Sequence, residues 1–301
     1  MNETNGDDSI DDATDAFVTH RNLLFTVAYE MLGSAADAED VLQETWLRWT
    51  KVDLETVRDQ RAYLVRIASR QALTRLRTIS RRKEAYVGEW LPEPLLTAPD
   101  VAEDVELAES VSMAMMLVLE TLNPTERAVF VLREVFGFEY DEIAGAVEKT
   151  QTAVRQIAHR ARSHVAARRP RSEPSAAEAQ GALEAFKRAI ETGDVQNLLD
   201  ILAPDVVVVG DGGGVKQAIL RPVVGADKAA RLLTAGLNRH GGEMSVDLVH
   251  ANGGPALLLW LNGEIDGIGA VRIDDGLVTG FYYVRNPEKL SRVQYETPVS
   301  R

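Results

Sequence analysis

Arginine side chains gather in two stretches of this sequence that contain no acidic residue. Residues 60–83 hold seven Arg and one Lys, and residues 150–172 hold six Arg. Guanidinium groups bind phosphate oxygens through charge-assisted hydrogen bonds. The chain carries 46 Asp and Glu residues and a net charge of −13, so the two gaps indicate local cationic surfaces on an acidic body. Charge acts within a Debye length of about 8–10 Å, so these surfaces favour phosphate contact, the alternative being that each run is a solvated helix face.

The second run lies on a predicted pair of helices. The first is short, from Tyr140 to Val147, and the next opens near Thr150. The second helix has a core stripe at helical spacing, formed by Val154, Ile157, Ala158, Ala161 and Val165. A short helix, a tight turn and a polar-faced second helix are typical of a helix-turn-helix. The residues predicted to contact DNA from its outer face are Gln151, Thr152, Arg155, Gln156, His159, Arg160 and Arg162. A three-helix packing unit that binds nothing is the alternative.

The first run belongs to a block of predicted helices that begins near Asp15. One helix extends from Ala36 to about Trp49 and another from about Arg61 into Arg77, with leucines on its buried face and arginines outside. The polar face of the earlier helix carries Asp37, Asp40, Gln43 and Glu44. Two prolines in three residues then break the helical register at Trp90-Leu91-Pro92-Glu93-Pro94, which predicts an extended connector.

A second linker, around residues 168–175, separates a C-terminal part of different composition. Helices are predicted there over residues 177–192, 195–202 and about 227–237, and strands over 206–209, 245–250, 256–262, 266–273 and 277–284. Asn252-Gly253-Gly254 and Asp274-Asp275-Gly276 are hairpin turn signals. Helices followed by a meander of antiparallel strands predict an α+β domain, with helices on one face of a curved sheet.

The two helical blocks resemble bacterial sigma factors of the extracytoplasmic-function (ECF) type. Residues 37–46, DAEDVLQETW, resemble their polymerase-binding helix, residues 61–77 their proximal-promoter helix, and residues 122–127 through 159–162 their distal-promoter domain. The resemblance implies that core RNA polymerase is bound by Asp37, Asp40, Gln43, Glu44 and Trp46. It implies that the proximal element is bound by Tyr63, Arg66, Arg70, Arg75 and Arg77. Arg70 and Thr74 stand where many members carry Asn and Asp.

The C-terminal part resembles the SnoaL-like, NTF2-like cone fold, which one group of these sigma factors carries behind the DNA-binding modules. Three short motifs recur in that group, and here they consist of Trp90, Leu91, Pro92, Glu93 and Pro94, then Asp211, Gly212, Gly213 and Gly214 with Lys216, then Asn286, Pro287, Glu288, Lys289 and Leu290. Val215 precedes Lys216, where the lysine commonly follows the glycines directly. The resemblance implies regulatory contacts of these motifs with the sigma blocks and the connector. The glycines themselves predict a tight turn rather than a phosphate site, since no helix N-terminus follows them.

The predicted organisation is an acidic tail over residues 1–14, a polymerase-binding and proximal-promoter helical domain over 15–86, a linker over 87–106, a helix-turn-helix distal-promoter domain over 107–168, a linker over 169–176 and a SnoaL-like regulatory domain over 177–301. The predicted partners are core RNA polymerase and promoter DNA. The C-terminal domain is expected to contact the sigma domains within the chain, without an obligatory separate anti-sigma factor. This organisation predicts a sigma factor regulated in cis.

Two other functions stay open at this stage. One is a ligand-responsive helix-turn-helix regulator with a small-molecule pocket in the cone. The other is a cyclase or isomerase that uses Asp211, His250 or Asp266 for acid–base chemistry. A cone filled by Val, Leu and Trp260 would exclude the enzyme, whereas an open cavity with convergent polar groups would favour it.

Composition excludes several classes of site and predicts a cytoplasmic, soluble chain, and the sigma-factor resemblance implies that it is not an enzyme. The absence of cysteine excludes disulfides, cysteine-ligated zinc and thiol nucleophiles. The five His residues show no metal-ligand spacing, so no metal or cofactor is expected. The acidic N-terminus lacks the apolar core of a secretory signal, and the longest apolar stretches are too short to span a bilayer.

Overall fold

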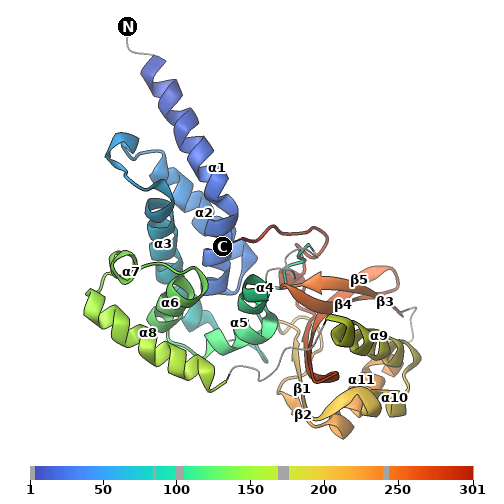
Figure 1. Ribbon diagram of the computed structural model, residues 1–301. Helices are drawn as coiled ribbons and strands as arrows, with labels where there is room; N and C mark the ends of the chain where they lie inside the picture. The colour runs from blue at the N-terminus through green and yellow to red at the C-terminus, as the bar shows by residue number, and fades with distance from the viewer. Residues whose placement is uncertain (1–3, 84–85, 99–104, 169–175, 240–243, 301) are drawn as a thin grey trace. The chain divides into compact units, whose positions relative to one another are not determined.

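The chain separates into a helical unit and an α+β unit (Figure 1). The structure, a computed structural model, describes residues 4–83, 86–98, 105–168, 176–239 and 244–300. The helical unit comprises residues 1–84, 118–168 and 298–301, and the α+β unit comprises residues 85–117 and 169–297. The connector around Trp90 and residues 107–117 therefore belong to the α+β unit, whereas the sequence analysis assigned residues 107–117 to the helix-turn-helix block. The domain boundaries predicted from the sequence stay a prediction.

Three helices form the first part of the helical unit: α1 (Thr4–Leu32), α2 (Ala35–Trp49) and α3 (Gln60–Lys83), which all pack against one another. A short 3-10 turn covers Leu54–Thr56. The hydroxyl of Ser34 caps α2 by accepting the Asp37 N–H at 3.2 Å. This unit also contains residues 298–300, where the Ser300 N–H donates to Thr26 Oγ1 at 3.0 Å.

Helix α1 begins at Thr4 and therefore extends into residues 1–14, for which the sequence predicted an acidic tail. The side chains of Ala13 and Ala16 are buried, so the apolar stripe of the helix extends before Asp15. The fully buried Trp49 donates its indole N–H to the carbonyl of Ala13 at 2.8 Å. Acidic composition alone did not reveal this attachment, which ties the early turns of α1 to the end of α2.

The second part of the helical unit holds the helix-turn-helix. It comprises residues 118–120 of α5 (Met113–Glu120), α6 (Pro124–Phe130), a π-helical turn (Val131–Val135), α7 (Tyr140–Val147) and α8 (Gln151–Ala166). Asn123 caps α6 and Thr150 caps α8, as their residue types favour. The π-helical turn follows α6 directly, so the backbone stays helical from Pro124 to Val135. Helix α3 packs against both α6 and α7.

The α+β unit is built on one six-stranded sheet in the order β2-β1-β6-β5-β4-β3. Its strands are β1 (Leu202–Asp211), β2 (Val223–Val224), β3 (Met244–Ala251), β4 (Gly254–Leu261), β5 (Glu264–Asp274) and β6 (Leu277–Val284). Strands β3 to β6 form the predicted antiparallel meander. Strand β1, however, pairs with β6 in parallel, which corrects the expectation of an all-antiparallel sheet. The long chain segment between β1 and β6 permits that return, since parallel pairing needs a crossover.

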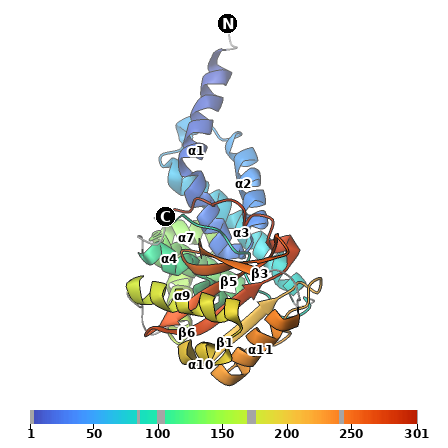
Figure 2. The same ribbon diagram turned by 90° about the vertical axis from the view of Figure 1, so that its right-hand side faces the viewer.

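The two faces of this sheet are covered by different segments. Helices α9 (Ala176–Thr192), α10 (Val195–Ile201) and α11 (Ala226–Arg239) pack on one face, and Figure 2 shows α9 running across it. The core there includes Phe186, Leu257 and Phe281. On the opposite face, Leu91 of the connector and Met113 join a second hydrophobic cluster. Helix α4 (Val105–Val111) precedes Met113 in the sequence. The predicted α+β architecture is confirmed, and the connector is part of its core.

Candidate functional site

The acidic face of α2 is occupied by an arginine from α3. Arg75 donates to Asp37 at 2.5 Å and to Asp40, and it lies 3.9 Å from Glu44. Burial opposes its charge, but the hydrogen bond with Asp37 and the nearby carboxylates raise the pKa of Arg75 above its usual value. The structure thus brings together one residue predicted to bind DNA and three predicted to bind polymerase.

The other predicted polymerase-binding residues on α2 have different surroundings. Gln43 is exposed. Trp46 is half-buried, with its ring 5.3 Å from that of Phe17 on α1. Aromatic packing therefore engages Trp46 within the fold, while Gln43 faces outward.

The remaining predicted proximal-promoter residues lie along α3. Arg66, Arg70 and Arg77 are exposed, and Arg70 forms an ion pair of 2.8 Å with Glu148 at the end of α7. Tyr63 is half-buried, with the Arg66 guanidinium 4.6 Å from its ring centre. The structure gives this aromatic ring a packed position and a cation–π contact, and its predicted role toward an unpaired base stays a prediction.

The outer face of α8 is exposed as its spacing predicted. All seven residues predicted to contact DNA are exposed: Gln151, Thr152, Arg155, Gln156, His159, Arg160 and Arg162. Two arginines farther along α8 lie near acidic side chains. Arg160 is 3.6 Å from Glu126, and Arg162 is 3.4 Å from Glu134. The guanidinium of Arg155 lies 5.4 Å from the ring centre of Tyr140. This helix can present its N-terminal polar side chains to a groove, and the assignment of bases stays a prediction.

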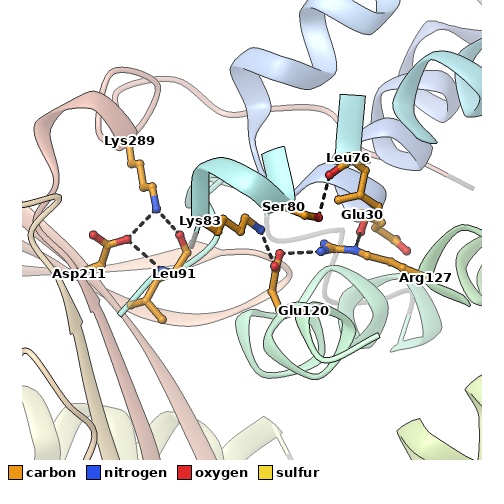
Figure 3. Close-up of polar contacts among 9 residues, drawn as sticks. All are labelled: Glu30, Leu76, Ser80, Lys83, Leu91, Glu120, Arg127, Asp211 and Lys289. Atoms are coloured by element: carbon orange, nitrogen blue, oxygen red, sulfur yellow. Dashed lines mark hydrogen bonds and ion pairs between the residues drawn. The ribbon is translucent and has the colours of Figure 1, made fainter. Parts of the chain in front are cut away.

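An ion cluster of one buried and two half-buried side chains, the Glu120 clasp, joins the two parts of the helical unit (Figure 3). Glu120 accepts from Arg127 at 2.6 Å and from Lys83. The Nε of Arg127, a residue only 1% exposed, donates to the carbonyl of Glu30 on α1 at 2.8 Å. Burial opposes ionisation of Glu120, but the two cations lower the pKa of its carboxyl. No sequence motif pairs these residues, so the clasp was not predicted.

The three motifs of the C-terminal resemblance meet at one buried carboxylate (Figure 3). Asp211, 1% exposed at the end of β1, accepts from the Leu91 N–H at 2.9 Å and from Lys289 at 2.7 Å. Lys289 also donates to the carbonyl of Leu91 at 2.6 Å. Tyr86 donates its hydroxyl to Asp211 at 2.6 Å, and Asn286 donates to that hydroxyl at 2.8 Å. We call Tyr86, Leu91, Asp211, Asn286 and Lys289 the Asp211 lock.

Aromatic rings of the connector complete the surroundings of Lys289. Its ammonium lies 3.3 Å from a ring centre of Trp90 and 4.9 Å from that of Tyr86. Burial and the hydrogen bond to Asp211 raise the pKa of Tyr86 above its usual value. Pro92, Glu93 and Pro94 are buried in the same unit, and Pro287–Lys289 form a 3-10 turn capped by Asn286 before Leu290. The sequence indicated these motifs but not Tyr86, which no local pattern distinguishes.

The glycines after Asp211 permit close approach of the chain to the lock. A Cβ on Gly212 would lie 2.0 Å from the Lys216 carbonyl oxygen. Gly213 has a φ of +65°, and a Cβ there would lie 2.5 Å from the Asn286 amide carbon. Gly214 also has a positive φ, and the turn is closed by the Lys216 N–H on the Gly212 carbonyl at 3.0 Å. The tight turn expected from the sequence is present, and Lys216 contacts Asp266 at 3.2 Å.

A second attachment of the connector surrounds Asn252. Its side chain accepts the Leu95 N–H at 3.1 Å and donates to the Val111 carbonyl at 3.0 Å. Its own N–H donates to the Leu95 carbonyl at 2.8 Å. Asn252 has a φ of +55° in the β3–β4 turn. The sequence identified this residue only as a turn former, because its partners lie more than a hundred positions away.

The three residues considered for acid–base chemistry occupy separate surroundings. Asp211 lies in the lock, His250 is exposed on β3, and Asp266 lies beside a cavity between the sheet and α11. Asp266 accepts from Tyr283 at 2.6 Å and from Arg285 at 2.8 Å. Burial opposes its ionisation, but hydrogen bonds from Arg285 and Tyr283 and the charges of Arg285 and Lys216 lower the pKa of Asp266 to about 2.

In the part of the chain that the structure describes, His, Asp and Glu side chains form no group of three suited to a metal ion. Among the described helices, none combines the length and apolar character required to cross a membrane.

Comparison with known proteins gives the family. Residues 16–82 match the model of sigma-70 region 2, and residues 112–165 match that of sigma-70 region 4. The chain is 36% identical to the ECF RNA polymerase sigma factor SigJ of Mycobacterium tuberculosis over 91% of its own length and 92% of that protein. It is 31% identical to the probable ECF RNA polymerase sigma factor SigI of the same species, over 95% and 97%. The crystal structure of the M. tuberculosis SigJ protein superposes with a TM-score of 0.74 at 31% identity, covering 93% of this chain and 98% of that one. The chain therefore belongs to the ECF RNA polymerase sigma factors.

Proposed function

We propose that the C-terminal domain regulates this sigma factor in cis by holding the connector between regions 2 and 4. The observation that carries the proposal is the Asp211 lock, in which a carboxylate of β1 binds the Leu91 backbone N–H and Lys289. Asn252 provides a second attachment at Leu95. A connector held at two points within a folded domain has less conformational freedom than a flexible linker. Release or retention of the connector would therefore change how the sigma regions engage a promoter.

Cis regulation needs no separate inhibitor, because a fused domain acts at high effective concentration. Residues 298–300, beyond the α+β unit, belong to the helical unit, where Ser300 contacts Thr26. We infer that no obligatory anti-sigma factor is required, and that the protein acts in the cytoplasm, where its promoter DNA and polymerase lie.

The helical unit supplies the two DNA-binding surfaces and the polymerase-binding surface in this proposal. The acidic face of α2 docks on core polymerase, the arginines of α3 meet the proximal element, and the exposed N-terminal half of α8 reads the distal element. Support comes from the exposure of Thr152, Arg155 and Gln156 at the start of a helix whose opposite face is buried.

Substitution of Arg155 tests the role of α8. Arg155→Ala is expected to weaken binding of the polymerase holoenzyme to a cognate promoter about 10–100-fold, since a base-edge contact is worth about 1–3 kcal/mol. Electrophoretic mobility shifts with core polymerase present measure it. Arg188→Ala, an exposed arginine of α9, is the control for lost charge. Equal binding by the Arg155 variant and wild type would contradict the assignment.

An enzymatic role is not favoured by the electrostatics of the cone. The cavity is open and has convergent polar groups, which on geometry alone would agree with an enzyme. General acid–base catalysis, however, works best with a pKa near the operating pH. The pKa of Asp266 is lowered to about 2, and burial and the Asp266 charge raise that of Tyr283 well above 10. The pKa values of both groups thus lie far from neutral pH, which supports a non-catalytic domain.

Transcription by an Asp211→Asn variant tests the cis regulation. Full-length variant and core polymerase are assayed on a cognate promoter, with Asp205→Asn, an exposed residue of the same strand, as matched control. Asp211→Asn is expected to change transcription at least about fivefold, the lower range of allosteric coupling, while the control stays within about twofold. An increase identifies the lock as restraining, and a decrease identifies it as supporting. Hydrogen exchange at the Leu91 amide verifies opening, and opening without any change in transcription would contradict the proposal.

Truncation is a less direct test, for a structural reason. Removing residues after 171 would expose Leu91 and Leu95, which are both fully buried against the α+β unit. Apolar surface of this kind favours association. Point substitution within the lock therefore separates regulation from aggregation better than deletion of the domain.

A further inference from the structure

The α+β unit contains a cavity that has no role in the regulation proposed above. It has a volume of about 230 Å³ and lies between the sheet and helices α9 and α11. A cavity of about 150 Å³ in another protein accommodates benzene, and sites for drug-sized ligands start at about 300 Å³. The space thus suits a molecule of about two fused rings, far below a nucleotide or a folded peptide.

The walls of the cavity are apolar over most of their extent. Leu232 and Leu233 of α11 face Leu259 of β4 and Phe281 of β6 across it, with Ile219 on a third side. Burial of apolar surface stabilises a ligand by about 25 cal/mol per Å². The cavity wall therefore favours a ligand that is apolar over most of its surface.

One end of the cavity is polar and carries net positive charge. Asp266, Tyr283 and Arg285 all line it, and Lys216 reaches Asp266 from the glycine turn. Two cations and one carboxylate leave one positive charge at this end. Tyr283 and Arg285 donate to Asp266, which holds the carboxylate in place. An acidic or strongly polarised oxygen of a ligand would be favoured there, and an ammonium group disfavoured.

The backbone connects this polar end directly to the Asp211 lock. Gly210 lines the cavity and precedes Asp211, while Arg285 lines it and precedes Asn286. The Arg285 and Asn286 N–H groups both donate to the Asp211 carbonyl, at 2.7 and 3.1 Å. The glycine turn forms a third connection, since it begins at Asp211 and ends at Lys216. Two cavity-lining residues, one at the end of β1 and one just after β6, are therefore each followed directly by a residue of the lock.

We propose that this cavity binds a small apolar carboxylic acid of about two rings, and that its occupancy alters the hold of the Asp211 lock on the connector. The coupling rests on the proposed function of the connector, whereas the binding itself does not. Binding and coupling are therefore measured separately, and neither measurement needs transcription.

Binding is tested on the full-length protein with 2-naphthoate, followed by its fluorescence. The cationic counterpart is 2-naphthylmethylammonium, which has the same ring system. Saturable binding of 2-naphthoate is expected, at least about tenfold tighter than the ammonium compound. Lys216→Met is expected to reduce that preference about fivefold, because a partly exposed charge contributes modestly. Absence of saturable binding by 2-naphthoate, or tighter binding of the ammonium, overturns the site.

A cavity-filling variant establishes where the probe binds. Gly236 lines the cavity on α11, and a Cβ built there meets no atom within 4 Å, so Gly236→Phe is expected to fit while occupying the space. Gly181 on α9 is a matched control, with the same open surroundings but no place in the cavity wall. Gly236→Phe is expected to weaken 2-naphthoate binding more than about tenfold and Gly181→Phe less than about twofold. Equal effects of the two variants, with both folded by circular dichroism, overturn the location.

Hydrogen exchange of the connector tests the coupling. Saturating 2-naphthoate is expected to change the exchange rate of the Leu91 amide at least about threefold in wild type and not in Gly236→Phe. Binding without any change at Leu91 overturns the coupling. If instead 2-naphthoate binds and alters Leu91 exchange while Asp211→Asn leaves transcription unchanged, the proposed cis regulation fails and the ligand site stands.

Discussion

Two carboxylates, the half-buried Glu120 in the helical unit and the buried Asp211 in the α+β unit, hold segments that are far apart in the sequence, and they do so with different partners. Glu120 in the helical unit is bound by two cations, Lys83 and Arg127. Asp211 in the α+β unit is bound by one cation, Lys289, and by three neutral donors, the Tyr86 hydroxyl and the N–H groups of Leu91 and Gly213.

The difference indicates what each carboxylate does. A charge matched by two charges stabilises a fixed junction, because removing it leaves two cations facing one another at low dielectric. A charge that also accepts a backbone N–H positions a segment of chain. Neutral donors can return to water at a much lower cost than buried ions. We therefore assign the Glu120 clasp to stability of the helical unit and the Asp211 lock to control of the connector.

The largest expected effect follows from substitution in the clasp. Glu120→Gln removes the charge that Lys83 and Arg127 share, and it is expected to lower the free energy of unfolding of the helical unit by about 3–5 kcal/mol. Denaturant unfolding followed by circular dichroism measures it. Glu148→Gln is the control, since Glu148 forms an exposed ion pair with Arg70 that is worth about 0–1 kcal/mol. Similar losses in the two variants would refute the assignment of the clasp.

A smaller effect is expected in the lock. Asp211→Asn leaves Lys289 with the Leu91 carbonyl and is expected to lower the free energy of unfolding of the α+β unit by about 2–3 kcal/mol. A double-mutant cycle with Lys289→Met measures the part due to this pair, expected at about 1–3 kcal/mol. A coupling near zero would mean that the neutral donors alone position the connector, which would remove the contrast with Glu120.

The sequence predicted the helices and strands of each unit better than the contacts that these elements make with one another. Caps at Asn123 and Thr150 and the apolar stripe of α8 place the helix-turn-helix correctly, since these signals act within a few residues. The parallel pairing of β1 with β6 was missed because strand pattern does not specify a partner. Glu120 and Arg127 have no periodic signature, and their role depends on Lys83, 37 residues away from Glu120.

The candidate site shows the same limit. The three motifs of the C-terminal resemblance indicated the participation of Leu91, Asp211 and Lys289, but not that they meet at one carboxylate. Tyr86 and Asn252 were missed because an isolated tyrosine and a turn asparagine carry no local sign of a distant partner. Contacts that join elements far apart in the chain require the fold itself.

The ionisation of Asp266 allows the polar end of the cavity to be tested by pH. The expected effect on the free energy of unfolding is smaller than in the lock. Its folded pKa of about 2 lies below the ordinary value of 3.8, so its contribution is present above about pH 4 and is lost as the pH falls toward 2. Asp266→Asn is expected to remove about 1 kcal/mol of this component, discounted for solvent screening. Denaturant unfolding of the α+β unit at pH 7, 4 and 2.5 measures it, with Asp205→Asn as control. A difference between wild type and variant that stays constant with pH would contradict the ionised state of Asp266.

The smallest effect on stability concerns Arg75, a half-buried cation of α3. Arg75→Gln is expected to change the free energy of unfolding by less than about 1 kcal/mol, since its partners Asp40 and Glu44 are half exposed. Loss of this cation leaves the acidic face of α2 more negative, so affinity for core polymerase is expected to rise about two- to fivefold at low salt and to return toward wild type at high salt.

The matched control for this effect is Arg77→Gln on the same helix. Arg77 is exposed, and the substitution changes the net charge equally without removing an ion pair to Asp37 or Asp40. Titration of fluorescently labelled chain with core polymerase at two salt concentrations compares the two variants. If both raise the affinity equally, net charge explains the effect; if only Arg75→Gln does, Arg75 masks the face that polymerase binds. A decrease with Arg75→Gln alone would show that Arg75 positions those carboxylates for polymerase.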